Sequence, residues 1–434
     1  MENPPMGLAE GFARTRRLTA RETHAYPLER MKPRRSERLE TQVGRLSRRE
    51  FLFGGLAAAL PANRAGRADL RIGLLLPPGP LGPSILRGAK LGITEADSLA
   101  QMFGKKIDLA LPPVPGPERV ASVASRLIKE GVSVLVSGGD ERAAKALPEV
   151  AREGKALFLN VGSASDRLRT ELCDRHTFHL HASVQMHVGA AGFWLIEEKK
   201  LRRWAVLSES DEIQRAVVAF AEARGATVEE GAQAVSGVTD WRPTLERLRA
   251  AEPEALWIGL RAETVPGFLQ QYRRAGLAGE LVGITPDAIG LPNVDPAGLS
   301  GVWPVMWHHT LEKYSARDLN SRYRRRFGQR LEGASWSAWA ALKLIGEAML
   351  RAGTTPEALL EFLESEPPFD GHKGRPLTFR KWDHQLRQPM YLAQARKAAR
   401  GESSPSGVEV IAEVPRGDLD AIVLPPKDGG CRIA

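Results

Sequence analysis

The chain has 434 residues, of which 43% are hydrophobic and 26% are charged, a balance typical of a globular protein with two or three domains. Its formal net charge is +9, but residues 1–68 hold 14 of the 61 Lys and Arg residues and only 7 of the 52 Asp and Glu residues. The rest of the chain is therefore almost neutral, which excludes the strongly basic surface of a typical nucleic-acid-binding protein.

The first 68 residues are predicted to be a leader for export by the twin-arginine route. Arg48 and Arg49 precede an apolar run over residues 51–60, and Gly66-Arg67-Ala68 offers small residues for cleavage. The run is about half of the ~20 residues that a membrane-spanning helix needs. We therefore expect a periplasmic protein; a basic tail without a targeting role is the alternative.

Short apolar strands alternate with amphipathic helices over residues 70–160. The first strand, 70–76, is ended by Pro77-Pro78, and the strand at 132–136 is ended by Ser137-Gly138-Gly139. The other predicted elements are helices 84–99, 117–130 and 141–153 and strands 107–111 and 156–160. This alternation predicts a parallel sheet with helices on both faces.

The same alternation repeats over residues 184–284. Here the predicted helices are 184–198, 213–224, 241–251 and 264–275, and the predicted strands are 204–208, 227–233, 255–259 and 280–284. Later elements are helices 314–331, 335–352 and 356–365 and strands 376–379 and 389–393. The predicted fold class is α/β, with two doubly wound parallel-sheet lobes around a cleft.

Small and polar residues follow four of the predicted strands, at the ends that lead into helices. The four turns are Ser137–Asp140, Asn160–Ser165, Ser208–Asp211 and Thr285–Asp287. Their backbone N–H groups suit a carboxylate or another anion, and Asp287 suits a cationic or hydroxyl group. The same residue types are ordinary helix caps and turn formers, so each turn alone has a structural explanation. Four such turns in two lobes favour a shared ligand cleft.

The order of elements over residues 69–397 resembles that of the branched-chain amino-acid-binding family, the substrate-binding proteins of ATP-driven importers. The segments that resemble it are Arg71-Ile72-Gly73, Leu86-Arg87-Gly88-Ala89-Lys90-Leu91 and Tyr272-Arg273-Arg274-Ala275-Gly276-Leu277. The resemblance implies the type I periplasmic-binding-protein fold. The expected parts are an N-terminal lobe of residues 69–181 plus 306–374, a C-terminal lobe of residues 182–305 plus 375–399, and an irregular tail of residues 400–434.

A narrower resemblance is to a subgroup found with systems that oxidise alcohols using pyrroloquinoline quinone (PQQ). The segments that resemble it are Leu168-Arg169 with Cys173, Phe178-His179, Ala182-Ser183, Met186 and most of Phe369–Pro389. Cys431 also looks like a subgroup feature. Cys173 and Cys431 are the only cysteines in the sequence, and whether they form a disulfide stays open at this stage.

The resemblance implies that two turns of the first lobe and an acid of the second hold the solute. The candidate ligand-binding residues are Gly139, Asp140, Gly162, Ser163, Ser165, Arg261 and Asp287. Two departures from the family are evident. Gly138-Gly139-Asp140 replaces a serine-rich turn, and the family's aromatic residue is absent near Leu260 and Arg261. We therefore do not expect leucine, isoleucine or valine as the ligand.

Four histidines, His176, His179, His181 and His187, lie close together in the sequence, and alternate histidines on a strand can face one metal. No other ligand cluster supports such a site, so we interpret them as strand and helix residues and predict no metal. The sequence also lacks phosphate-binding glycine motifs, a nucleophile elbow and an H-E-x-x-H motif. Neither a cofactor nor enzymatic activity is predicted.

These features together predict a non-catalytic periplasmic protein that traps a small solute by hinge closure. The expected partners are the solute and an ABC permease of the inner membrane, without nucleic acid, and the expected assembly is a monomer or weak dimer. The alternative is a periplasmic accessory or sensory protein that kept the fold but lost the amino-acid site. The departures at Gly138–Asp140 favour that alternative.

Overall fold

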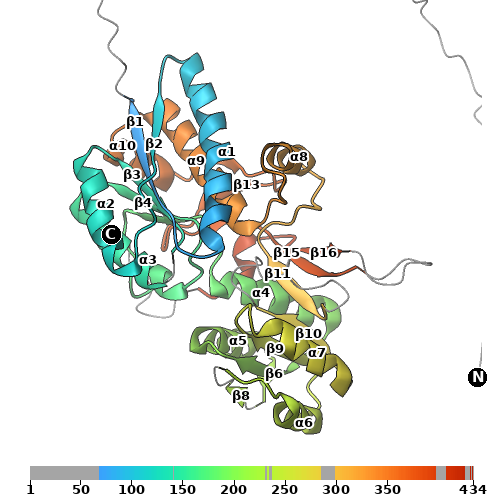
Figure 1. The fold of residues 1–434 in the computed structure, drawn as a ribbon. Helices are drawn as coiled ribbons and strands as arrows, with labels where there is room; N and C mark the ends of the chain where they lie inside the picture. Colours follow the sequence, from blue (N-terminus) through green and yellow to red (C-terminus); the bar gives the residue numbers. More distant parts are fainter. Residues whose placement is uncertain are drawn as a thin grey trace, which may run out of the picture. The chain divides into compact units, whose positions relative to one another are not determined.

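The computed structural model describes residues 68–139, 141–229, 232–233, 237–284, 299–396 and 407–425, together with Cys431 and Ile433. The predicted leader, Asp140 and Asp287 lie outside these residues. The first lobe is built on a parallel sheet with the order β2-β1-β3-β4-β5 (Figure 1). Its strands are β1 (Leu70–Leu75), β2 (Ile107–Ala110), β3 (Val134–Ser137), β4 (Leu157–Asn160) and β5 (Thr177–His179). Every residue of β3, β4 and β5 is buried, as expected for a sheet covered on both faces.

Helices cover both faces of this first sheet. α1 (Leu81–Met102) and α9 (Gly333–Ala352) pack on one face, and α2 (Val120–Lys129) and α3 (Glu141–Glu153) pack on the other (Figure 1). α1 and α9 approach closely because Gly88 lacks a side chain; a Cβ there would lie 2.0 Å from the Ser335 carbonyl oxygen. α8 (Ala316–Phe327) and α10 (Pro356–Glu364) complete this lobe.

The second lobe is built on an eight-stranded sheet with the order β16-β15-β11-β10-β9-β6-β7, with β8 also beside β6. Its strands are β6 (Arg203–Ser208), β7 (Thr227–Val228), β8 (Ala232–Gln233), β9 (Ala255–Gly259), β10 (Glu280–Gly283), β11 (Val302–Val305), β15 (Met390–Ala395) and β16 (Val408–Val414). β6 to β11 are parallel, whereas β15 and β16 join the sheet in antiparallel pairs. The sheet is therefore mixed, with a parallel centre.

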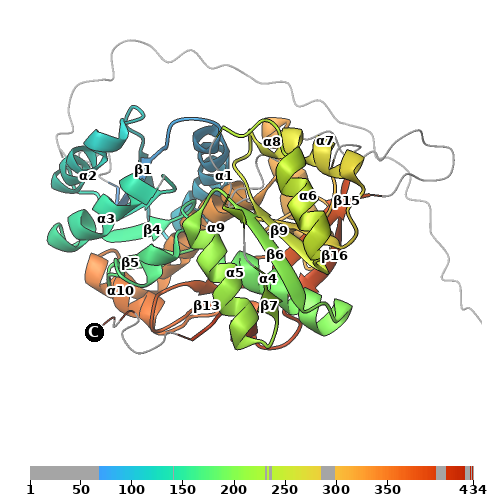
Figure 2. The ribbon, with the colours of Figure 1, turned by 90° about the horizontal axis from the view of Figure 1, so that it is seen from below.

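Helices also cover both faces of the second sheet. α4 (Val184–Trp194), extended by a π-helical turn at Leu195–Lys199, and α5 (Asp211–Ala223) lie on one face. α6 (Arg242–Ala251) and α7 (Val265–Ala275) lie on the other, with β6 and β9 between the two layers (Figure 2). Among the described residues, no helix is long and apolar enough to cross a membrane.

Three connections join the two lobes. The chain leaves the first sheet after β5, returns after β11, and leaves again between β14 (Leu386–Arg387) and β15. β14 belongs to a small antiparallel sheet with β12 (Phe369–Asp370) and β13 (Pro376–Phe379). These three connections form the hinge region between the lobes.

Two parts of the chain differ from the predicted division. The predicted C-terminal lobe resumes at residue 375, but His384 accepts a hydrogen bond from the His179 N–H with its carbonyl oxygen at 2.9 Å, beside β5 of the first lobe. The predicted tail includes β16, which pairs with β15 over its whole length. The tail is also attached by a disulfide between Cys173 and Cys431, whose Cα atoms are 5.7 Å apart.

Candidate functional site

The two predicted ligand turns of the first lobe lie in direct backbone contact. Gly138 follows β3 and Gly162 follows β4, and the two strands are neighbours in the sheet. A Cβ on Gly138 would lie 2.8 Å from the Gly162 nitrogen, and a Cβ on Gly162 would lie 2.6 Å from the Gly138 carbonyl oxygen. Only glycine at both positions allows this approach, and the two turns lie together because β3 and β4 end at the same edge of the sheet.

The side chain of Asn160, at the end of β4, forms hydrogen bonds with backbone groups of the second turn. Its Oδ1 accepts hydrogen bonds from the N–H groups of Gly162, at 3.2 Å, and Ser163, at 2.9 Å. Its Nδ2 donates to the Ser163 carbonyl oxygen at 2.8 Å. The N–H groups that were expected to face a solute carboxylate at these two positions are therefore already bonded within the lobe.

Glu212, near the start of α5 in the second lobe, reaches the second turn of the first lobe. Its Oε1 accepts a hydrogen bond from Ser165 Oγ at 3.0 Å and another from the Asp166 N–H at 2.6 Å. Ser165 is buried in this arrangement. The candidate ligand serine of the first lobe thus contacts a carboxylate of the opposite lobe.

The carboxyl group of Asp166 lies beside this contact. Its Oδ1 accepts a hydrogen bond from the Gln185 N–H at 3.1 Å, at the start of α4. Burial raises the pKa of Asp166 to about 7, and the charge of Glu212 adds to this effect. The hydrogen bond from Gln185 and the charge of Arg169 act in the opposite direction. Asp166 is therefore an acid that titrates near neutral pH, at the meeting point of the two lobes.

Arg261, the candidate residue of the second lobe, is engaged by acids of its own lobe. Its N–H donates to Glu209 Oε2 at 2.7 Å, and its guanidinium lies 3.2 Å from Glu209 Oε1 and 3.2 Å from Glu263 Oε1. Burial opposes ionisation of Glu209, but the contacts with Arg261 outweigh burial and hold its pKa below the ordinary value. Arg261 and Glu209 lie in turns after neighbouring strands, β9 and β6.

Little space remains beside Gly139 at the end of β3. The hollow that it lines with Ser137 and the first-lobe prolines has a volume of about 10 Å³, roughly the room that one water needs. Solute pockets usually have about 300–1,000 Å³. This hollow is therefore too small for a solute in the present arrangement.

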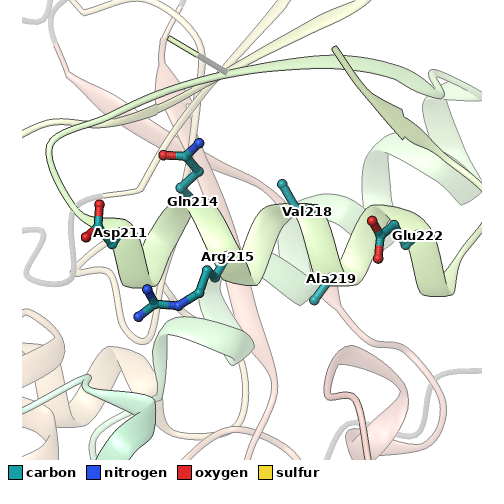
Figure 3. A pocket seen from close by; sticks show the side chains of 6 residues that line it. All are labelled: Asp211, Gln214, Arg215, Val218, Ala219 and Glu222. Atoms are coloured by element: carbon teal, nitrogen blue, oxygen red, sulfur yellow. The ribbon is translucent and has the colours of Figure 1, made fainter. Parts of the chain in front are cut away.

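A larger groove of about 480 Å³ follows one face of α5 (Figure 3). Its lining residues are Asp211, Gln214, Arg215, Val218, Ala219 and Glu222. They recur at intervals of three and four residues, as expected for one helix face. All of its described lining belongs to this single helix.

Arg169, a residue of the narrower resemblance, is buried behind the second turn. Its Nη1 donates to the carbonyl oxygens of Ser165, at 2.8 Å, and Ser163, at 3.2 Å. Its Nε donates to Gln385 Oε1 at 2.7 Å, and its Nη2 donates to the His181 carbonyl oxygen at 2.7 Å. Arg169 therefore positions the backbone of the ligand turn and joins it to the hinge region.

Lys373, in the late segment of that resemblance, lies among the three hinge connections. Its Nζ donates to the carbonyl oxygens of Met306, at 2.6 Å, and Pro389, at 3.2 Å, and to Gln388 Oε1 at 2.7 Å. Gln388 Nε2 in turn donates to the Leu180 carbonyl oxygen at 2.9 Å. Because Leu180, Met306 and Gln388 belong to different connections, this one buried amine links all three.

Three of the clustered histidines, His179, His181 and His187, contact protein groups through Nδ1. His179 Nδ1 lies 3.1 Å from Asn160 Nδ2, and His181 Nδ1 lies 2.9 Å from the Ala182 carbonyl oxygen. Burial, with the charge of Arg169, lowers the pKa of His179 well below its ordinary value. Within the part of the chain that the structure describes, no group of three or more His, Cys, Asp or Glu residues could hold a metal ion.

Comparison with known proteins agrees with this architecture. The model of the periplasmic binding protein family matches residues 70–401. The chain belongs to this family. Its members bind solutes and are not enzymes, which agrees with the prediction that the chain has no enzymatic activity. No curated protein matches the chain.

Solved structures share the fold at low sequence identity. A branched-chain amino acid ABC transporter periplasmic ligand-binding protein from Burkholderia xenovorans is 15% identical, with a TM-score of 0.74 over 82% of this chain and 97% of that chain. A leucine-, isoleucine-, valine-, threonine- and alanine-binding protein from Brucella ovis, in a closed conformation, is 17% identical. Its TM-score is 0.73 over 85% of this chain and 100% of that chain. A solute-binding protein from Rhodopseudomonas palustris, in complex with 3,4-dihydroxybenzoic acid, is 19% identical. Its TM-score is 0.64 over 79% of this chain and 96% of that chain. These matches establish the type I periplasmic-binding-protein fold.

Glu212, Asn160 and Lys373 were not among the candidate ligand-binding residues predicted from the sequence. A signal existed for Glu212, which follows directly on the turn Ser208–Asp211 that was assigned to the cleft. Asn160 opens the turn Asn160–Ser165 that was predicted to face the cleft, but its side chain was not predicted to accept the N–H groups of that turn. Lys373 lies in the late segment Phe369–Pro389 of the narrower resemblance, which gave this residue no role of its own. Its burial among the hinge connections depends on contacts with residues 67 positions away, such as Met306.

Proposed function

We propose that this protein is the periplasmic solute-binding component of an ABC-type importer and that it traps a small solute by hinge closure. The main support is that turns at the carboxyl ends of strands in the two lobes meet at Ser165 and Glu212. Ligands of open α/β sheets bind outside these strand ends. The three hinge connections permit the two lobes to open and close on a solute.

The proposed solute contacts are Gly139, Asp140, Gly162, Ser163, Ser165, Arg261 and Asp287. Ser165 has the strongest geometric support, since its hydroxyl contacts Glu212 of the opposite lobe. Arg261 is proposed because it lies in the turn after β9, at the carboxyl end of that strand. The partners in this proposal are the solute and an inner-membrane permease, with a monomer or weak dimer as the working state. Export by the twin-arginine leader would place the protein in the periplasm.

A finer part of the proposal links the importer to alcohol oxidation that depends on PQQ. Its support is the narrower resemblance, whose residues Arg169, Lys373 and Gln385 form the buried contacts of the ligand turn and hinge. The solute would then be an alcohol, a product of alcohol oxidation, or PQQ itself. If no such solute binds, the accessory or sensory role becomes the better explanation.

Ligand screening of the exported protein tests the proposal. Native mass spectrometry of freshly purified protein identifies any retained solute. Thermal shift and tryptophan fluorescence then measure the binding of amino acids, aliphatic and aromatic alcohols, their acids, and PQQ. The expected result is a saturable shift with one chemical class. The absence of any retained solute and of any shift across the panel would contradict the solute-binding function.

A further inference from the structure

The contact between Glu212 and the first lobe has the form of a bound carboxylate. One hydroxyl donor, Ser165 Oγ, and one backbone donor, the Asp166 N–H, converge on Glu212 Oε1 at 3.0 and 2.6 Å. Charge-assisted hydrogen bonds of this kind are about twice as strong as neutral ones. A carboxylate supplied by the protein therefore fills a position where a carboxylate of a solute would find the same two donors.

Several other donors near the first-lobe turn already have partners within the protein. Asn160 Oδ1 accepts the N–H groups of Gly162 and Ser163. The guanidinium of Arg169 lies behind the turn, 4% exposed, and donates to four protein oxygens. An anionic solute would therefore compete with Glu212 for the donors of Ser165 and Asp166.

We propose that Glu212 determines the specificity of the cleft: it occupies the carboxylate-accepting position of the first lobe, so that the cleft selects solutes with a neutral or cationic group at that position. This proposal rests on the proposed solute-binding function. Matching structures include one in complex with 3,4-dihydroxybenzoic acid and one named for binding amino acids, and both of these ligand types have a carboxylate. Glu212 would make this chain differ from them in solute class.

The local charges favour the same solute class. Asp166 and Glu212 already place two carboxyl groups beside one another, and burial together with Glu212 raises the pKa of Asp166 to about 7. A third carboxylate would add like-charge repulsion in a partly buried site, where it is poorly screened. A hydroxyl or an ammonium group of a solute can instead donate to Glu212.

Two substitutions separate the charge of Glu212 from its hydrogen bonds. Glu212→Gln keeps an oxygen that accepts from Ser165 and Asp166 but removes the charge, whereas Glu212→Ala removes both. Glu222→Ala is the matched control, because Glu222 lies three turns further along α5 (Figure 3). Calorimetry with benzoate, benzyl alcohol and benzylamine compares three probes that share a ring and differ in charge.

The wild type and Glu222→Ala are expected to bind benzyl alcohol or benzylamine more tightly than benzoate. Glu212→Ala is expected to gain about tenfold or more in affinity for benzoate, and Glu212→Gln is expected to gain less. Wild-type protein that binds benzoate more tightly than both other probes would overturn the specificity proposal while leaving the solute-binding function intact.

Small-angle scattering without solute gives a readout that does not depend on the probes. The Glu212→Ala variant should have a larger radius of gyration than the wild type, because its lobes lose the contacts of Glu212 with Ser165 and Asp166, and Glu222→Ala should not. If none of the probes binds any variant, the solute-binding proposal fails for this class of solute. In that case, an unchanged radius of gyration of the Glu212→Ala variant would also overturn the proposed role of Glu212. An increased radius of gyration would instead support the contact of Glu212 with the first lobe.

Discussion

At the scale of single residues, the buried amine of Lys373 contributes most clearly to the hinge region. Its three acceptors come from Met306, Gln388 and Pro389, and its Nζ lies 4.1 Å from the centroid of the Trp336 ring. Three donors matched to three acceptors favour the ammonium form, although burial lowers the pKa of Lys373 well below its ordinary value. The hinge therefore depends on one cation whose contacts are all protein groups or an aromatic face.

Substitution of Lys373 tests this role. Lys373→Met keeps most of the stem but leaves buried oxygens of Met306 and Gln388 without their donor, so we expect a loss of about 2 to 4 kcal/mol in the free energy of unfolding. Urea denaturation of the variant and the wild type measures this change in the free energy of unfolding. Lys381→Met is the control from the same late segment: Lys381 is 77% exposed and should change stability by less than about 0.5 kcal/mol. Equal effects of the two variants would refute a special role for Lys373.

Asp166 is predicted to make stability depend on pH. Its pKa is about 7 in the folded protein and about 3.9 in an unfolded chain. Because the folded state binds the proton more tightly, this group stabilises the fold below about pH 4, and that contribution is lost as the pH rises through about 7. The groups that set the shift are Glu212, Arg169, Ser183 and the Gln185 N–H.

The variant Asp166→Asn mimics the protonated acid at every pH. Its stability advantage over the wild type should be about 2 to 3 kcal/mol larger at pH 8 than at pH 5, because most of the interval between the unfolded and folded pKa values lies above pH 5. Thermal or urea unfolding at both pH values gives the comparison. A stability difference that is the same at pH 5 and pH 8 would show that the acid does not titrate in this range.

At the scale of elements, the contact between α1 and α9 depends on glycine. A Cβ on Gly88 would lie 2.0 Å from the Ser335 carbonyl oxygen, which belongs to helix backbone and cannot move alone. Gly88→Ala should therefore separate the two helices and cost about 2 kcal/mol or more, as overpacking does elsewhere. Circular dichroism during thermal unfolding measures the change.

Gly267 in α7 provides a control, because a substitution by alanine there is expected to raise stability instead of lowering it. No atom lies within 4 Å of a Cβ placed on Gly267. Alanine is intrinsically more favourable than glycine in a helix by about 0.8 to 1 kcal/mol, so Gly267→Ala should stabilise the protein slightly. A stabilised Gly88→Ala variant would mean that the two helices tolerate a wider spacing than the structure gives.

Hydrophobic periodicity located most elements because helices and strands are local features of a sequence. The predicted bounds of α3 (Glu141–Glu153) and β9 (Ala255–Gly259) are those of the structure. β11 was not predicted because it contains Pro304, a residue that argues against a central strand. β16 shows an alternation of apolar and other residues over much of its length, but the surrounding glycine, proline and serine residues hid that signal.

The candidate site could be predicted only to the level of its turns. Gly138 and Gly162 had to be close because the carboxyl ends of parallel strands share one edge of a sheet. Which donors remain available for a solute could not be predicted, because Asn160 and Glu212 compete for them. The Ser165–Glu212 contact joins residues 47 positions apart in different lobes, and no local pattern encodes such a pair.

At the scale of the whole molecule, the two lobes are linked by more than their covalent connections. Lys373 joins the three hinge connections, Arg169 joins the ligand turn to the hinge, and Glu212 joins the two lobes at the cleft. Lys373 and Arg169 belong to the narrower resemblance. These contacts explain why the segment from Phe369 to Pro389, although rich in polar residues, is largely buried.

The disulfide between Cys173 and Cys431 makes the route of export testable. Disulfides form in oxidising compartments such as the periplasm and are rare in the cytosol, and the twin-arginine route is the proposed path between the two. Replacement of Arg48 and Arg49 by lysine should therefore keep the protein in the cytoplasm with both cysteines as thiols. Alkylation before reduction, read by mass spectrometry, should then label two cysteines in the retained variant and none in the exported wild type. Normal export of the double-lysine variant would refute the twin-arginine assignment, and an oxidised pair in the retained protein would show that the disulfide forms independently of export.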